Sequence, residues 1–324
     1  MVHYPGRVSI IGAGTLGGTI AYSLIMEDLA KEILLVDMSS NIVQGQVLDL
    51  AEASEGTNIV LRAGTFKEAG QSSLVIITAD VEPYDDEERN EWLTRSRRLF
   101  LGIMSSMSPI HDDILILVAS EPADLYVHVL ADYFPRLSPK RVFGIGTTMA
   151  TFRFQTWLTE LTDTNINDIK DAYCIGTQSD PIIVWSCAKV QDSPVTFIPL
   201  LVSQKPALDT IVSNHRYHLI RKRKGRAWYG VAATVTRLIK EFLNLQKKGK
   251  GRASDQVTGT SNQRTWVLSV YVPHLEAYMS WPVKLNSQGI KEIIHLPLST
   301  DELEKINKVK ELNQYDFQTS AQLL

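Results

Sequence analysis

The most constraining feature of this chain is a glycine-rich turn near its amino end. Residues 7–11 (RVSII) form an apolar run typical of a strand, and they lead directly into IGAGTLGG. Gly12, Gly14 and Gly17 give the spacing G-x-G-x-x-G, and residues 16–26 continue with helical spacing. In such a unit the first glycine permits a tight turn, the second lets the backbone approach a pyrophosphate, and the third lets the helix pack on the strand.

A second strand supplies the carboxylate that a dinucleotide site requires. Residues 32–37 read EILLVD, so that Asp37 ends the strand 20 residues beyond Gly17. A carboxylate at this position can accept hydrogen bonds from ribose hydroxyls, and it would repel the 2′-phosphate of NADP. We therefore predict NAD as the cofactor. The alternative is that these glycines only form a structural turn in an α/β sheet.

The order of the remaining segments predicts the fold class. Strand-like runs occupy residues 74–78, 114–119, 141–145, 173–185 and 265–281, and helical spacing occupies residues 42–53, 87–107, 151–161, 227–243 and the stretch from 301. Regular alternation in the first half indicates a parallel sheet, whereas the later strands look antiparallel. We predict an α/β protein with a Rossmann parallel sheet domain over residues 1–145 and a mixed α/β substrate domain over residues 146–324.

Composition excludes several classes of protein. A chain of 324 residues with 44% hydrophobic content can build its core without metal or disulfides, and Cys174 and Cys187 are not in a C-x-x-C spacing, so we expect no metal. The amino end lacks a signal-peptide pattern, and no run of 18 apolar residues could span a membrane, so a cytoplasmic location is expected. The net charge of −3 gives no reason to expect a nucleic-acid partner.

Three further segments carry a family resemblance: NIVQGQVLDLAEAS (41–54), RAGTFKEAGQSSLVIITA (62–79) and PKRVFGIGT (139–147). Through them, and through the glycine turn, the chain resembles the L-lactate/malate dehydrogenase family over nearly its whole length, and it is most similar to fungal-type L-lactate dehydrogenases. The resemblance implies a Rossmann domain followed by a substrate domain, with a loop at residues 79–89 that closes over substrate and nicotinamide. It also leads us to expect a homo-oligomer.

The family's catalytic residues transfer to this chain only in part. By resemblance, Arg89 is the loop arginine that polarises the substrate carbonyl, and Arg153 in TFRFQ grips the substrate carboxylate. A small carboxylate ligand is therefore expected. The family's GEHGD turn, whose histidine exchanges the proton, corresponds to GTQSD here, and Gln178 stands at the histidine position.

Other positions depart from the family pattern as well. Ala150 stands where an aspartate orients the histidine, Glu121 stands in place of an asparagine, and Ala227 stands in place of a threonine. In the loop, Pro83 occupies the position that distinguishes pyruvate from oxaloacetate. A glutamine amide neither accepts nor releases a proton near pH 7, so the catalytic site is predicted to be degenerate.

Two functions stay open from the sequence. The first is an NAD(H)-binding relative of these dehydrogenases with impaired hydride transfer, which acts by binding or by assembling with a partner. The second is an active NAD-dependent oxidoreductase of the L-lactate dehydrogenase type with an altered substrate or proton donor, in which water, Glu121 or Asp180 moves the proton.

Basic residues are concentrated in two places. Arg226 follows the run RKRK at residues 221–224, and Lys247, Lys248, Lys250 and Arg252 lie in a Gly/Ser-rich stretch that looks like an insertion. We interpret both as a solvated face and a mobile loop. Binding to an acidic partner or to RNA is the weaker alternative, because aromatic residues do not alternate with the charges.

Overall fold

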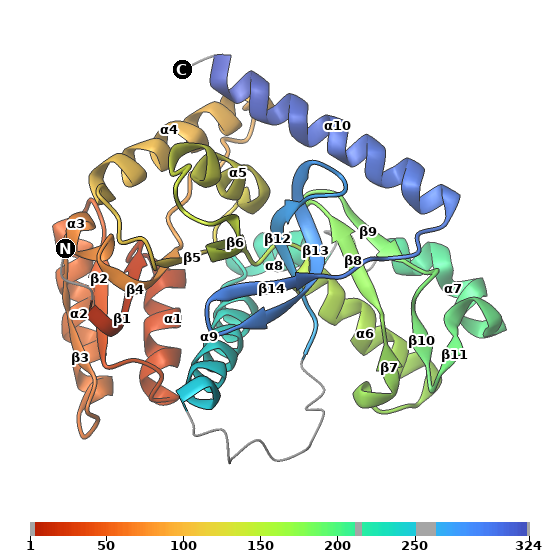
Figure 1. Ribbon diagram of the computed structural model, residues 1–324, viewed down its shortest axis with the longest axis horizontal. Helices are drawn as coiled ribbons and strands as arrows, with labels where there is room; N and C mark the ends of the chain where they lie inside the picture. Colours follow the sequence, from red (N-terminus) through yellow and green to blue (C-terminus); the bar gives the residue numbers. More distant parts are fainter. Residues whose placement is uncertain (1–3, 211–215, 251–263, 323–324) are drawn as a thin grey trace.

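A single mixed sheet runs through the molecule, with helices on both of its faces (Figure 1). The computed structural model describes residues 4–210, 216–250 and 264–322. Arg252 and the rest of the Gly/Ser-rich stretch from residue 251 to 263 therefore lie outside the described residues. Within the described part of the chain the sheet has 11 strands, and a separate small sheet has 3.

The amino-terminal half of the sheet is parallel and has the strand order β3-β2-β1-β4-β5-β6. Its strands are β1 (Tyr4–Ile11), β2 (Glu32–Val36), β3 (Val60–Ala63), β4 (Ser72–Ile77), β5 (Leu115–Val118) and β6 (Val142–Gly144). Its helices are α1 (Thr15–Met26), α2 (Ser40–Ser54), α3 (Phe66–Ala69), α4 (Arg89–Met107) and α5 (Ala123–Tyr133). The strand order reverses between β1 and β4, and a ligand crevice is expected at the carboxyl ends of these two strands.

The second half continues the same sheet with antiparallel strands, because Ser269 of β12 (Trp266–Val272) pairs with Gly144 of β6. The order continues through β13 (Ala277–Asn286), β8 (Tyr173–Gly176) and β9 (Pro181–Val184), and β14 (Gly289–Ile293) pairs with β13. The small sheet consists of β7 (Ile169–Lys170), β10 (Lys189–Val190) and β11 (Ser193–Pro194). The helices are α6 (Thr148–Thr162), α7 (Pro199–Thr210), α8 (Arg216–Lys224), α9 (Tyr229–Lys250) and α10 (Thr300–Gln322).

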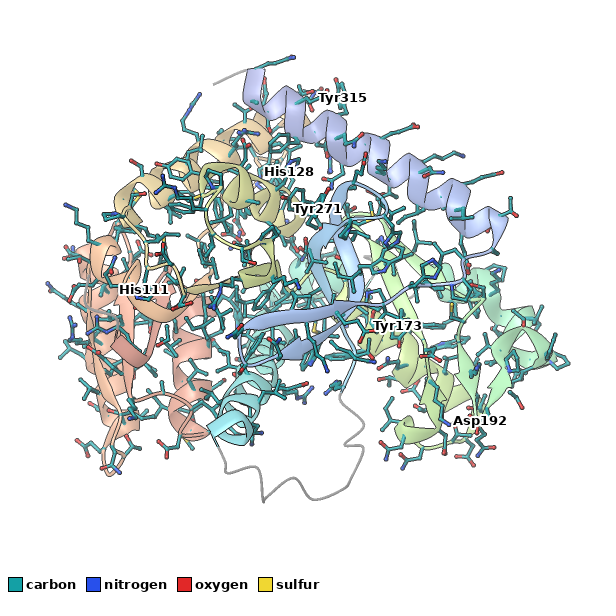
Figure 2. All side chains as sticks on the ribbon, viewed as in Figure 1. His111, His128, Tyr173, Asp192, Tyr271 and Tyr315 are labelled. Atoms are coloured by element: carbon teal, nitrogen blue, oxygen red, sulfur yellow. The ribbon has the colours of Figure 1, made fainter. Side chains whose placement is uncertain are left out.

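Two late helices return to the amino-terminal half. Helix α9 packs beside α1, and α10 crosses over α4 and α5 (Figure 1). His128 of α5 stacks with Phe317 of α10 and Tyr278 of β13, with ring centroids 3.5 and 4.3 Å apart (Figure 2). Burial lowers the pKa of His128 to about 4, so it is a neutral packing residue at pH 7.

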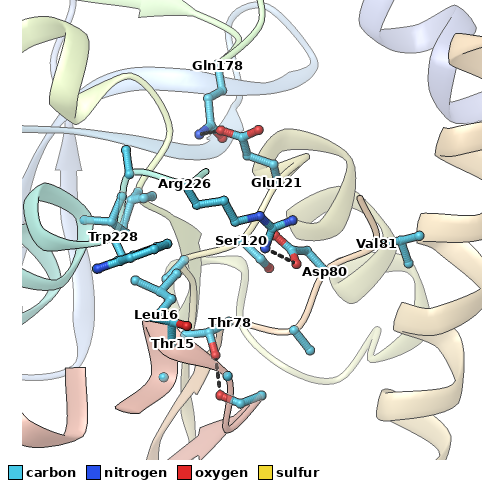
Figure 3. A pocket seen from close by; sticks show the side chains of 18 of the residues that line it. Thr15, Leu16, Thr78, Asp80, Val81, Ser120, Glu121, Gln178, Arg226 and Trp228 are labelled. Carbon is cyan, nitrogen blue, oxygen red and sulfur yellow. Dashed lines mark hydrogen bonds and ion pairs between the residues drawn. The ribbon is translucent and has the colours of Figure 1, made fainter. Parts of the chain in front are cut away.

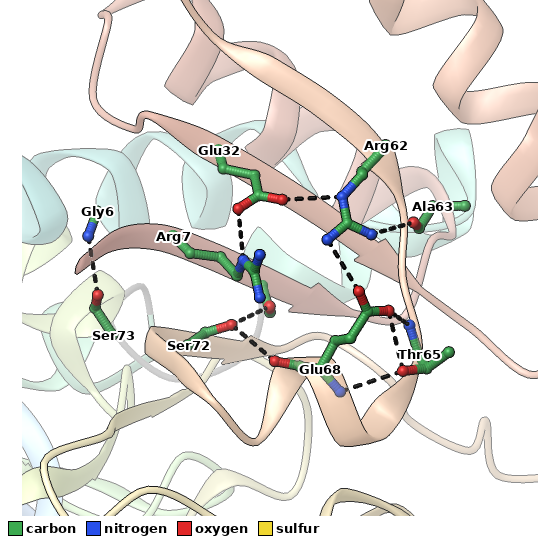
Figure 4. Close-up of polar contacts among 10 residues, drawn as sticks. Gly6, Arg7, Glu32, Arg62, Ala63, Thr65, Glu68, Ser72 and Ser73 are labelled. Atoms are coloured by element: carbon green, nitrogen blue, oxygen red, sulfur yellow. Dashed lines mark hydrogen bonds and ion pairs between the residues drawn. The ribbon is translucent and has the colours of Figure 1, made fainter. Parts of the chain in front are cut away.

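A charged cluster joins the first three strands (Figure 4). Arg7 of β1 and Arg62 of β3 both contact Glu32 of β2, at 2.6 and 2.9 Å, and Arg62 also contacts Glu68 of α3 at 2.9 Å. Burial alone would raise the pKa of Glu32, but hydrogen bonds and the charges of both arginines lower it below its ordinary value. The cluster thus holds these three strands together.

The predicted fold class is correct: a Rossmann sheet is followed by an α/β half with a mixed sheet. We keep the division after residue 145 as a proposal, and it falls directly between β6 and α6. No helix among the described residues is long and apolar enough to cross a membrane.

Candidate functional site

The glycine turn has the geometry that its sequence predicts. Gly12 has φ +105°, a backbone conformation that L side chains rarely adopt. A Cβ atom on Gly17 would lie 1.9 Å from the carbonyl oxygen of Gly12, so only glycine lets α1 begin this close to β1. A Cβ atom on Gly14, in contrast, would meet no atom within 4 Å. The turn is therefore tightly packed at Gly12 and Gly17, whereas Gly14 borders open space. This open space suits a pyrophosphate at the start of α1.

Asp37 connects this turn to the end of β2. Its Oδ2 atom accepts a hydrogen bond from the backbone N–H of Ala13 at 2.8 Å, and its Oδ1 atom accepts one from Ser39 at 3.0 Å. An ionised carboxylate has about four acceptor positions, so two are left for ribose hydroxyls. The residues in this part of the site thus fit the adenosine side of NAD.

One cavity of about 690 Å³ joins the predicted cofactor residues to the predicted catalytic residues. Gly12, Gly14, Gly17 and Asp37 line one part of it, and Arg153 and Gln178 line another (Figure 3 shows part of the wall). None of the described residues that line it is a histidine, cysteine, lysine or tyrosine. Elsewhere too, no group of three or more His, Cys, Asp or Glu side chains in the described residues could hold a metal ion.

Gln178 contacts Glu121, another residue that departs from the family pattern (Figure 3). The Nε2 atom of Gln178 donates a hydrogen bond to Oε1 of Glu121 at 2.8 Å. Because an ionised carboxylate only accepts, the amide nitrogen faces Glu121 and the amide oxygen faces away. That oxygen is buried and has no hydrogen-bond partner among the described residues.

Asp124 forms a hydrogen bond with the backbone of the turn that contains Gln178. Its Oδ2 atom accepts the backbone N–H of Gln178 at 3.0 Å, and its Oδ1 atom accepts from the hydroxyl of Ser280 at 3.4 Å. Burial raises the pKa of Asp124 to about 6, and these hydrogen bonds oppose the rise. The carboxyl group thus links the start of α5 to the turn between β8 and β9.

Helix α6 supplies both Ala150 and Arg153 to the cavity wall. Thr151 holds this helix against β8, because its hydroxyl accepts the backbone N–H of Cys174 at 3.0 Å. Ala150, at the position of the orienting aspartate, is buried and offers only a methyl group. Arg153 and Gln178 thus share one cavity, without a carboxylate at residue 150.

Arg89 lies apart from this cavity. It is the first residue of α4, and its Nη2 atom lies 2.7 Å from Oδ2 of Asp316 on α10. Both residues line a second, much smaller cavity, which Asp180 also lines. The structure therefore brings Arg153, Gln178 and the cofactor residues together but does not place Arg89 or Asp180 with them. The role of Arg89 stays a prediction.

The loop after β4 is held by several contacts. Trp92 donates its ring N–H to the carbonyl of Val81 at 2.7 Å, and Arg95 pairs with Glu87 at 2.5 Å. Pro83 lines the large cavity, as does Ala227. The loop thus forms one wall of the cavity.

Arg226 and Asp80 are site residues that the sequence interpretation missed. Arg226 was assigned to a solvated basic face, but it lines the cavity and its Nη1 atom lies 3.0 Å from Oδ1 of Asp80 (Figure 3). Its neighbour Arg221 lines the cavity too. The one available signal was that Arg226 lies in KGRAW, directly before the family threonine position at Ala227.

Fold and site define a nicotinamide-dinucleotide-binding protein with an α/β second half. Residues 6–144 match the NAD-binding domain of lactate/malate dehydrogenase, and residues 147–316 match its alpha/beta C-terminal domain. The chain belongs to the lactate/malate dehydrogenase family.

Curated relatives and solved structures agree with this assignment. The chain is 33% identical to L-lactate dehydrogenase A of Rhizopus oryzae, covering 91% of this chain and 87% of the relative. It is 28% identical to an L-lactate dehydrogenase of Clostridium perfringens, covering 94% of each. The minor L-lactate dehydrogenase from Enterococcus mundtii, solved in a ligands-bound form, has the same fold, with a TM-score of 0.84 at 24% identity over 97% of this chain and 98% of that one. The predicted similarity to fungal-type enzymes thus agrees with the Rhizopus match.

Substitution of two glycines separates packing from cofactor binding. Gly17→Ala should destabilise the protein by about 1–3 kcal/mol, because the new Cβ collides with the carbonyl oxygen of Gly12. Gly14→Ala should leave the melting temperature nearly unchanged but weaken NADH binding, because its Cβ fills the open side of the turn. Thermal unfolding and NADH fluorescence titration measure the two effects. Equal stability of the two variants would contradict this account of the turn.

The buried carboxyl group of Asp124 should make stability depend on pH. Its raised pKa of about 6 compares with an ordinary value of 3.8, so the folded state binds the proton more tightly. Stability that is complete below pH 4 is then lost as pH rises to about 6, by up to about 3 kcal/mol. In Asp124→Asn this loss should be absent, whereas the exposed control Asp112→Asn should follow the wild type. Denaturant unfolding between pH 4 and 7 tests this, and parallel curves for all three proteins would refute it.

Proposed function

We propose that this protein binds NAD(H) and is impaired in hydride transfer between the cofactor and 2-oxo or 2-hydroxy acids. The observation that carries the proposal is the hydrogen bond from Gln178 to Glu121 at the family's proton-exchange position. The contact places the Gln178 amide as a donor against a carboxyl oxygen, and an amide neither accepts nor releases a proton near pH 7.

Reduction of a 2-oxo acid requires a proton as well as a hydride. The dinucleotide would supply the hydride when bound, whereas a side chain or water must supply the proton to the oxygen that becomes a hydroxyl. Among the described residues lining the cavity, the carboxyl groups are those of Asp37, Asp80 and Glu121. Asp37 is engaged by the glycine turn and Asp80 by Arg226, which supports impairment.

Ligand binding is a separate matter from proton transfer. Arg153 lines the cavity beside Ala150, where it can bind a small carboxylate through two parallel hydrogen bonds. The proposed role is therefore binding of NAD(H), with or without such a carboxylate, by a protein that acts through assembly with a partner or with copies of itself. Asp37 disfavours a 2′-phosphate, so the proposal specifies NADH over NADPH.

The alternative function is an active oxidoreductase with a different proton donor. Glu121 favours it, because this carboxylate lines the cavity and lies 2.8 Å from Gln178. In that case Glu121→Gln would abolish turnover. In an impaired protein the same substitution would not lower the residual rate.

Steady-state NADH oxidation tests the proposal directly. With pyruvate or oxaloacetate, turnover should be slower than in a relative with an intact histidine by at least about 10²-fold to 10⁴-fold, the usual contribution of a positioned acid–base group. In parallel, NADH should bind and raise its fluorescence, and NADPH should bind more weakly. An ordinary dehydrogenase rate with either acid would overturn the proposed impairment, and absence of NADH binding would overturn the cofactor assignment.

Restoration of the family residues should recover activity in a defined order. Gln178→His alone should recover little, because Ala150 cannot fix the tautomer of the imidazole. Gln178→His with Ala150→Asp should gain more than the product of the two single gains, since the two residues act as a unit. Adding Glu121→Asn should raise the rate further by removing a carboxylate that competes for Arg153. A double variant no faster than the better single variant would count against the proposed cause of impairment.

A further inference from the structure

The carboxylate of Asp80 lies in the cavity wall, two residues beyond the point where the end of β4 contacts the glycine turn. Strand β4 runs parallel to β1, with Ile77 opposite Ile11. Directly after β4, the hydroxyl of Thr78 donates to the carbonyl of Gly12 at 2.7 Å, and a Cβ on Gly12 would lie 2.6 Å from the backbone nitrogen of Ala79. Asp80 is the next residue along the chain, and its side chain is 20% exposed and lines the cavity.

Such a carboxylate opposes cofactor binding unless its charge is balanced. A pyrophosphate at the start of α1 carries two negative charges and would lie at the same edge of the sheet as Asp80. Burial is the largest influence on Asp80 and raises its pKa, whereas the neighbouring Arg226 acts in the opposite direction. Repulsion between two unit charges a few ångströms apart is worth about a factor of ten or more in affinity at a partly buried site.

Arg226 supplies the balancing charge from a distant part of the chain. Its Nη1 atom lies 3.0 Å from Asp80, and its Nε atom contacts Glu82 in the same loop (Figure 3). The segment between α8 and α9 is positioned by Lys224, whose ammonium group lies over the rings of Trp228 and Tyr229 at 4.3 and 4.0 Å. Glu82 is 55% exposed, so Asp80 is the partner whose charge is more shielded from water.

We infer that Arg226 is a cofactor-binding residue, whose guanidinium neutralises Asp80 so that the pyrophosphate of a dinucleotide can lie against the glycine turn. The inference rests on NAD(H) binding by this cavity. From the sequence alone, Arg226 was interpreted as part of a solvated face; its pairing with Asp80 gives it a role in cofactor binding. It also explains why an acidic residue is tolerated next to the phosphate position: Asp80 and Arg226 act as a pair.

A double-mutant cycle tests the pairing through NADH affinity. Arg226→Ala should weaken NADH binding by at least about tenfold, because it leaves Asp80 charged beside the pyrophosphate. Asp80→Asn should bind NADH as tightly as the wild type or more tightly, and the double variant should return to within a few-fold of wild type. Arg223→Ala, which removes an exposed arginine of α8 outside the cavity, is the matched control and should have no effect.

Two smaller ligands separate electrostatics at the pyrophosphate from a general loss of structure. ADP-ribose carries the pyrophosphate and should show the same pattern as NADH, whereas adenosine lacks it and should bind all four proteins alike. If Arg226→Ala does not fold, Asp80→Asn still decides the matter, since it should bind ADP-ribose at least as tightly as the wild type does.

The inference is overturned by unchanged NADH affinity in Arg226→Ala, by weaker ADP-ribose binding in Asp80→Asn, or by equal losses for adenosine and ADP-ribose. A wild-type protein that binds neither NADH nor ADP-ribose would instead overturn the NAD(H) assignment on which the inference rests. The two failures are therefore distinguishable.

Discussion

The close approach of Gly17 to the carbonyl oxygen of Gly12 is the contact on which the site depends. A side-chain carbon at Gly17 would come within 1.9 Å of that oxygen, so α1 can start directly at the end of β1 only because both residues are glycine. The same turn meets Thr78 and Ala79 at the end of β4. These contacts create the open crevice at the reversal of strand order, and the rest of the cavity is built around it.

The part of the cavity that contains Gln178 differs from the family pattern in the chemistry of its side chains. In the family pattern a histidine and an asparagine face the substrate, but here Gln178 and Glu121 contact each other, and buried Asp124 holds the backbone of Gln178. This arrangement retains a defined shape and hydrogen bonding without an imidazole. The cations Arg153, Arg221 and Arg226 all line the cavity, so it is suited to anions.

The sequence predicted what depends on local pattern. The parallel strands, their apolar runs and the glycine turn could be predicted because strand periodicity and turn chemistry are local. Helix α5 was missed because seven of its eleven residues are buried, and a short apolar run does not by its pattern distinguish a buried helix from a strand. Edge strand β3 was missed because its four residues are largely exposed or intermediate and include Arg62.

Some residues of the site could be predicted from the sequence, and others could not. Gln178, Ala150, Arg153 and Glu121 share the cavity as the family motifs imply. Arg89 is placed instead by Asp316, which is more than 200 residues away in sequence, and Arg226 is placed by Asp80 in the loop after β4. Ion pairs between segments so distant in the chain depend on tertiary packing, and they cannot be predicted from the spacing of residues in the sequence.

Under the proposed function, this site binds the cofactor but lacks a group that delivers the proton. A single-turnover experiment tests this most directly: protein in excess over NADH is mixed with saturating pyruvate or oxaloacetate, and loss of NADH absorbance is followed by stopped flow, so that product release does not limit the signal. The account predicts that NADH is bound, as its fluorescence shows, and is then consumed slowly with no rapid phase. Complete and rapid consumption of the bound NADH with either acid would contradict it.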